Sequence, residues 1–128
     1  MIKTDKSLLD IYFDWEDKLD NDEWYFSNSF ESITKDMSSE EAFNYIPNVI
    51  EMLFKLDDDF LIWETLYFLI ELYNIANTTQ IHPFLERNWS LLKIHIKKYD
   101  DSYATPFKEL KRHLRITEST ADSTKRVR

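Results

Sequence analysis

The amino-acid sequence predicts an all-α protein of six or seven helices joined by short loops. Apolar residues recur with the 3.6-residue period of a helix in each well-marked segment. The 128 residues include no glycine, which disfavours tight β-hairpins because their turns need residues that tolerate positive φ. The chain is 43% hydrophobic and 16% aromatic, so it has enough apolar side chains for a dense core.

Two helices are predicted before residue 38. An apolar stripe at i, i+4, i+7 and i+11 predicts a helix over residues 5–19. A second stripe predicts a helix over residues 22–37, although the serines within it lower its helical propensity. The two stripes consist of Leu8, Tyr12, Trp15 and Leu19, and of Phe26, Phe30, Ile33 and Met37.

Helix caps and a proline organise the middle of the chain. Ser38 followed by Glu41 predicts a capping box that opens a helix. Because proline lacks a donor and clashes with the preceding turn, Pro47 is expected to separate a short helix over 39–45 from a new helix over 47–56. The three aspartates at 57–59 cap the next helix, over 59–76. In that helix 13 of the 17 residues from 60 to 76 are apolar, so we expect it to be the central one.

Two more helices complete the predicted domain. Pro83 opens a helix over 83–99, and Thr105 with Pro106 predicts the N-cap and first residue of a helix over 105–116. Residues 117–128 have almost no apolar content and are expected to be a disordered tail, which leaves a single helical domain over 1–116. No secretory signal or membrane span is recognisable, so a cytoplasmic location is expected.

Over residues 47–116, which would hold two units, the sequence pattern resembles HEAT or armadillo helical repeats. Tyr45–Leu53 is similar to the opening of a repeat's first helix, and Asp57–Asp59 is similar to the acidic turn of such repeats. Ile81–Leu85 resembles the opening of another unit, and its Pro83 follows Pro47 by 36 residues, which is near the period of two-helix repeats. The resemblance implies an irregular HEAT-like α-α hairpin array, with a compact bundle as the alternative. Such arrays mostly serve as binding scaffolds.

The charge of the chain changes sign along its length. Residues 1–86 hold 5 Lys+Arg against 19 Asp+Glu, a net of −14, and residues 87–128 hold 11 against 5, a net of +6. An uneven distribution of this kind indicates one acidic and one basic face or end. Acidic surfaces attract basic protein partners and repel nucleic acid.

The candidate binding residues are acidic, with one aromatic anchor. The first set lies on the polar side of the first predicted helix and in the segment that follows it, where Trp24 is the anchor. The alternative for this set is a solvated helix face with Trp24 tucked under a loop. The second set is a polar line at i, i+7 and i+14 on the central helix, and its alternative is that helix's solvent edge. The sets are Asp10, Asp14, Asp17, Asp20, Asp22, Glu23 and Trp24, and Asp57, Glu64 and Glu71.

No enzyme, metal site or cofactor is predicted. The absence of glycine excludes phosphate-binding and nucleophile-elbow motifs, and the absence of cysteine excludes thiolate chemistry. His95 and His113 lie on different predicted helices without a histidine at i+3 or i+4, and His82 stands apart. The aspartates at 57–59 enter a helix in different directions, which favours capping over cation binding.

Small size, acidity, an all-helical build and the absence of a catalytic constellation resemble the immunity proteins that bacteria make against their own toxins. This resemblance implies a protein-binding module that neutralises a basic toxin domain by occlusion, without turnover. A HEAT-like adaptor joining two proteins is the alternative. A nucleic-acid binder that uses Lys108, Lys111 and Arg115 is a weaker alternative, because the net charge of −8 opposes it.

Overall fold

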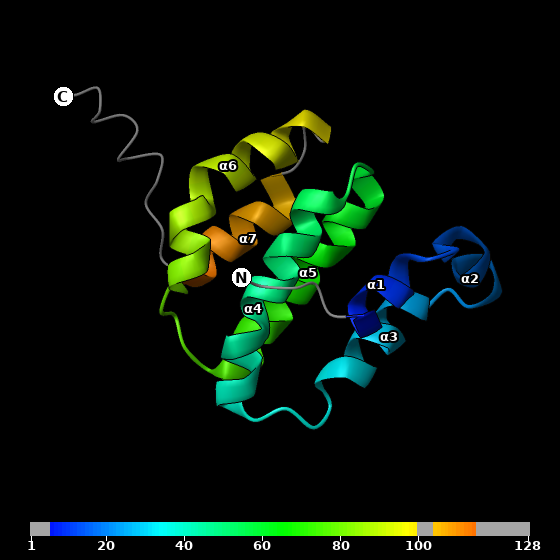
Figure 1. Cartoon of the computed structure of the whole chain (residues 1–128), viewed down its shortest axis with the longest axis horizontal. Coiled ribbons are helices and arrows are strands. Elements are labelled where there is room, and N and C mark those ends of the chain that lie inside the picture. The colour runs from blue at the N-terminus through cyan, green and yellow to red at the C-terminus, as the bar shows by residue number, and fades with distance from the viewer. Residues whose placement is uncertain (1–5, 100–103, 115–128) are drawn as a thin grey trace.

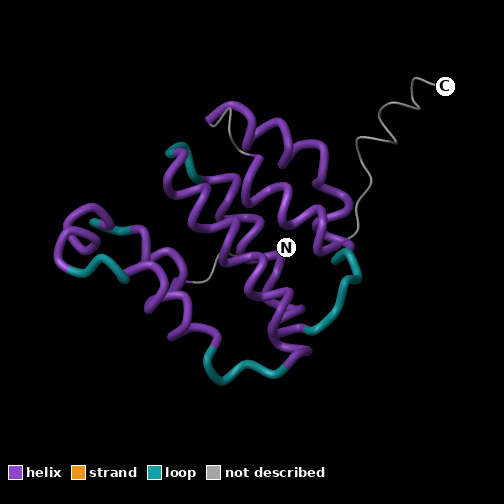
Figure 2. The backbone as a smooth tube through the Cα atoms, turned by 180° about the vertical axis from the view of Figure 1, so that it is seen from behind, coloured by secondary structure: helices purple, strands orange, loops and turns teal. Residues whose placement is uncertain are grey.

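The computed structural model describes residues 6–99 and 104–114, and these residues form seven α-helices and no strand (Figures 1 and 2). The predicted all-α fold of six or seven helices is therefore confirmed. The helices are α1 (Lys6–Tyr12), α2 (Trp15–Asn21), α3 (Tyr25–Thr34), α4 (Ser39–Lys55), α5 (Asp59–Ala76), α6 (Pro83–Tyr99) and α7 (Ala104–Leu114).

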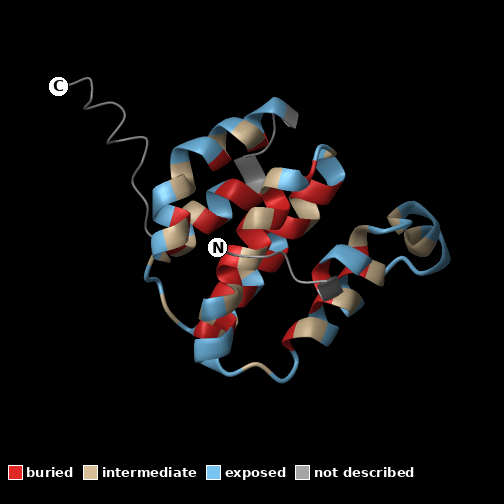
Figure 3. Cartoon of the chain, in the orientation of Figure 1, coloured by how far each residue is buried: buried red, intermediate tan, exposed pale blue. Residues whose placement is uncertain are grey.

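The α4–α5 hairpin forms the centre of the molecule, with α6 and α7 beside it (Figure 1). Helix α6 packs mainly against α4, and α7 packs against α5. Helix α5 contacts α3, α4, α6 and α7, as its apolar sequence predicts. Its Leu66, Leu69 and Leu72 are at most 1% exposed, and buried residues recur along α4 and α5 (Figure 3).

Helices α1–α3 form a smaller unit on the other side of α5 (Figure 1). This unit, which we call the N-terminal lobe, is joined to α4 by residues 35–38. Helix α3 packs against α5, and side chains of α1 and α2 also contact α5. The lobe's contact with α5 is largely aromatic: Phe30 stacks on Phe68 with ring centroids 4.2 Å apart, and Trp15 stacks on Phe60 at 5.5 Å. The lobe and the hairpin thus share one core.

The single helix predicted over residues 5–19 is wrong, because Asp14 breaks it into α1 and α2. Asp14 has φ 55 and ψ 34, a left-handed conformation that aspartate tolerates better than most residues. The Tyr12 hydroxyl, before the break, forms a hydrogen bond with the Thr65 hydroxyl of α5. Trp15, after the break, stacks on Phe60. Contacts with α5 on both sides of the break outweigh the local helical period. Helix α3 is also shorter than predicted, at residues 25–34.

The predicted interruption at Pro47 is also wrong. Helix α4 runs without a break from Ser39 to Lys55, and Pro47 lies buried inside it. Ile46, Val49 and Ile50 on either side of the proline are 0% exposed. Burying this continuous apolar face offsets the cost of an interior proline, which is about 3 kcal/mol relative to alanine.

The capping box at Ser38 and the aspartate cap of α5 are formed as predicted. Ser38 accepts from the Glu41 backbone N–H, and the Glu41 side chain accepts from the Ser38 backbone N–H at 2.8 Å. Asp58 caps α5, and Asn77 ends it at φ 56 in the left-handed region, the position where many proteins place glycine.

The start of the last helix differs from the prediction. Helix α7 begins at Ala104, so Thr105 lies inside it instead of capping it. The predicted end of this helix at residues 115–116 and the predicted disordered tail at 117–128 lie outside the described residues.

Candidate functional site: an acidic groove between α3 and α5

The first acidic set is distributed over three elements of the N-terminal lobe. Asp10 lies on α1, Asp14 lies at the break, and Asp17 and Asp20 lie on α2. The prediction that three of these carboxylates share one face of one helix is therefore wrong, because the break separates them. All seven members of the set are exposed: Asp10, Asp14, Asp17, Asp20, Asp22, Glu23 and Trp24.

Trp24 is 63% exposed and stands in the turn that opens α3. Its backbone N–H donates to an Asp22 carboxylate oxygen at 3.0 Å, which holds the turn in place. Phe13, which the sequence patterns did not single out, is 69% exposed on the same lobe. The amino group of Lys18 lies 5.7 Å from its ring centroid. The lobe therefore presents two exposed aromatic rings among carboxylates.

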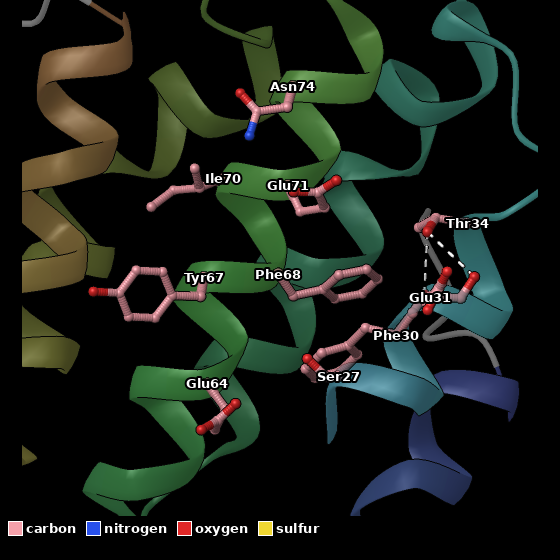
Figure 4. Close-up of a pocket in the computed structure, with 10 residues that line it drawn as sticks. All are labelled: Ser27, Phe30, Glu31, Thr34, Glu64, Tyr67, Phe68, Ile70, Glu71 and Asn74. Atoms are coloured by element: carbon pink, nitrogen blue, oxygen red, sulfur yellow. Dashed lines mark hydrogen bonds between the residues drawn. The ribbon is translucent and has the colours of Figure 1, made fainter. Parts of the chain in front are cut away.

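The second acidic set leads to a groove between α3 and α5, which has a volume of about 520 Å³ (Figure 4). Glu64 and Glu71 line it from α5, and Glu31 lines it from α3. Asp57 is exposed in the α4–α5 loop and does not line the groove. The structure thus brings two of the three predicted residues together and adds one that was not predicted.

Aromatic side chains form the apolar part of this groove. The Phe30 and Phe68 rings are nearly parallel, with an interplanar angle of 7°, and join the two walls. Tyr67 is 38% exposed and also lines the groove; its ring extends from α5 on the side away from α3 (Figure 4). Trp63 lies one turn before Tyr67, with ring centroids 6.2 Å apart. A ligand in the groove would therefore meet the exposed Tyr67 ring and the groove carboxylates.

The groove carboxylates have no cationic partner within the described part of the chain. No ion pair or hydrogen bond engages the carboxylates of Glu31, Glu64 or Glu71 there. Burial raises the pKa of Glu64, because the charged form loses solvation. Burial also raises the pKa of the nearby Tyr12 hydroxyl, and the charge of Glu64 acts in the same direction. The groove therefore holds negative charge that the fold leaves uncompensated.

The three histidines each hold backbone groups in place. The Nδ1 atom of His82 accepts from the Phe84 N–H at 3.0 Å near the start of α6, and burial lowers the pKa of this imidazole. His95 Nε2 lies 2.8 Å from the Leu56 carbonyl oxygen, and His113 Nε2 lies 3.3 Å from that of Thr78. Among residues 6–99 and 104–114, no group of three potential metal ligands is found.

Two basic residues of α7, Lys111 and Arg112, contact other residues of the same helix. The Lys111 amino group lies 5.6 Å from the Phe107 ring centroid, and Arg112 pairs with Glu109 at 3.6 Å. Lys108 is exposed, and Arg115 lies outside the described residues.

Comparisons with models of known families, with curated proteins and with solved structures find no match to this chain. None of the helices described is both long enough and apolar enough to span a membrane.

Sequence reasoning identified the α5 side of the groove and missed its α3 side. Glu64, Tyr67 and Glu71 share one helix face at i, i+3 and i+7, so Tyr67 was recognisable from the same pattern as the two glutamates. Glu31 carried no such signal, because its place depends on how α3 packs against α5.

Proposed function

We propose that this chain is a protein-binding module, of the immunity-protein type, that neutralises a basic toxin domain by occlusion. The observation that carries the proposal is that Glu31, Glu64 and Glu71 line one groove together with the exposed Tyr67 ring. Three unpaired carboxylates favour a cationic ligand, and a concave surface with aromatic residues is typical of protein-binding hot spots.

A protein segment that carries lysine or arginine side chains is chemically complementary to this groove. The side chains of lysine and arginine combine an apolar stem with a cationic head. The stem would pack on Tyr67, and the head would reach Glu64 or Glu71. An aromatic face adds a cation–π attraction of about 0.5–2 kcal/mol. The groove's volume of about 520 Å³ accommodates a few such side chains.

The exposed acids of the N-terminal lobe have a separate role in this proposal. They would steer a basic partner towards the groove, since long-range attraction mainly sets the association rate. Trp24 and Phe13 are the exposed rings available to anchor the edge of the contact. Charge reversal at Asp17 and Asp20, which are exposed on α2, is expected to slow association, to make it less sensitive to salt and to leave the fold intact.

The groove itself is tested with a fluorescent helical peptide that carries lysines at i and i+7, the spacing of Glu64 and Glu71. Replacing both glutamates with glutamine is expected to weaken binding at least about tenfold, the loss of one good charged contact. Glu40→Gln together with Glu86→Gln, at exposed sites outside the groove, is the matched control. Equal affinities for the wild type and the groove variant would overturn the proposal.

Immunity is tested by co-expressing this chain with the product of a neighbouring gene that is toxic to cells when expressed alone. The wild type is expected to protect the cells, and the groove variant is expected to lose protection while remaining folded by circular dichroism. Full protection by a folded groove variant would remove the groove from the mechanism.

One observation favours a HEAT-like adaptor as the second candidate. Helix α6 packs on α4 and α7 packs on α5, which is the stacking expected of two consecutive helical hairpins. An adaptor requires two partners bound at once. A pull-down that recovers two host proteins through separable surfaces would therefore support it over the immunity proposal.

A further inference from the structure

The outer face of α6 carries an apolar patch with a cation at each end. Leu91 is 61% exposed and Ile94 is 57% exposed, and they lie one turn apart. Arg87 lies one turn before Leu91, and Lys98 lies one turn after Ile94; both are exposed. Within the described residues no ion pair engages either cation. We call these four residues the α6 patch.

The α6 patch is complementary in charge and polarity to the α3–α5 groove. The groove offers carboxylates and the exposed Tyr67 ring, and the patch offers two branched apolar side chains between cations. Seven residues of helix separate Glu64 from Glu71, about 10 Å, and eleven separate Arg87 from Lys98, about 16 Å. Long cationic side chains that bend inward from the ends of the patch close this difference.

The patch of one molecule does not reach the groove of the same molecule. Helix α6 is fixed to the α4–α5 hairpin through its opposite face, where Leu85, Leu92 and Ile96 are 0% exposed. Figure 1 shows α6 and α3 on different sides of the hairpin. A groove that receives this patch must therefore belong to a second copy.

We propose that the chain associates with itself, the α6 patch of one copy docking in the α3–α5 groove of another. Two copies that exchange patches reciprocally form a closed dimer, and one-way docking forms an open chain. The inference rests on the groove of the proposed function and assigns that site a form of regulation, because a partner must displace the second copy. In the absence of a partner, the α3–α5 groove is then covered by the second copy.

The test is the mass of the full-length chain by sedimentation velocity, from dilute to concentrated solution. The wild type is expected to shift from its monomer mass of 15.6 kDa towards twice that value, and less so at high salt, which screens the charged contacts. Arg87→Glu with Lys98→Glu is expected to remain monomeric, as is Glu64→Lys with Glu71→Lys. Lys55→Glu with Lys108→Glu is the matched control and is expected to associate like the wild type.

Mixing the two monomeric variants distinguishes this docking from any other self-association. In a mixed dimer, the reversed patch of one variant meets the reversed groove of the other. The native patch of the second variant meets the native groove of the first, so both contacts are complementary in charge. The mixture is therefore expected to form a dimer. A wild type that is monomeric throughout, or a mixture that stays monomeric, would overturn the inference.

The peptide probe keeps this inference separate from the proposed function. Binding of the basic peptide by a strictly monomeric wild type would defeat self-association and leave the proposed function standing. Self-association without peptide binding would support the dimer and contradict the proposed function. If both hold, the peptide is expected to dissociate the dimer, because the two compete for one groove.

Discussion

Glu64 is placed where binding and stability make opposite demands. Its carboxylate is half-buried beside Tyr12 and has no compensating cation among the described residues. Burial raises its pKa above the ordinary value of 4.5, so the folded state holds the proton more tightly than the unfolded state does. Stability therefore falls as the pH rises through the interval above 4.5. The charge that destabilises the free fold is the charge that would attract a partner.

Glu64→Gln is expected to raise the melting temperature at neutral pH by on the order of a degree or two. Glutamine keeps the shape of the side chain and removes the buried charge, so the gain should disappear below pH 4.5, where the wild-type carboxyl is also neutral. Thermal melts of both proteins across this range provide the measurement. Glu71→Gln, at an exposed carboxylate, is the control. A gain that persists at low pH would show that the buried charge is not its cause.

Helices α4 and α1 show where the sequence pattern determines an element and where packing overrides it. The Ser38–Glu41 capping box and the cap at Asp58 follow from local hydrogen bonding, so they were predictable. Pro47 and Asp14 were not, since each reflects a balance with distant partners. Burial against neighbouring helices carries α4 through its proline, and contacts with α5 break the first helix despite its regular apolar stripe.

Pro47→Ala is expected to stabilise the protein by about 1 kcal/mol. An interior proline costs a helix about 3 kcal/mol relative to alanine. Removing the proline would regain this cost. About 2 kcal/mol of the gain is offset, because alanine buries fewer methylene groups and leaves the unfolded chain with more conformational freedom. Urea denaturation gives the difference. A net loss of stability would mean that the buried ring contributes more to the core than its helix defect costs.

The described residues form two parts that meet along α5: a body of helices α4–α7 and the smaller N-terminal lobe of helices α1–α3. The sequence alone identified Glu64 and Glu71 as candidate site residues, because a helix places residues seven apart on one face. It did not identify Glu31, because no local pattern determines how the lobe docks. The stacking of Phe30 on Phe68 provides that docking, and the two residues are 38 positions apart in the chain.

Phe30→Ala is expected to cost about 3–5 kcal/mol, as for other buried phenylalanines, and to loosen the lobe more than the body. Phe30 is 8% exposed and forms the stacked contact between α3 and α5. Hydrogen exchange should then accelerate in α1–α3 and change little in the buried part of α4. Tyr67→Ala, at a more exposed ring of the same groove, serves as the control. Uniform acceleration throughout the chain would contradict a separate lobe.

The two walls of the groove belong to the two parts of the molecule that the Phe30–Phe68 stack holds together. A ligand that contacts both walls would stabilise the contact between the lobe and helices α4–α7, because the ligand would have to dissociate before the two parts could separate. Ligand binding and the association of the lobe with α5 are then thermodynamically linked. Any true ligand of this groove should therefore raise the melting temperature and slow amide exchange in the lobe, so a thermal-shift screen is a route to finding it.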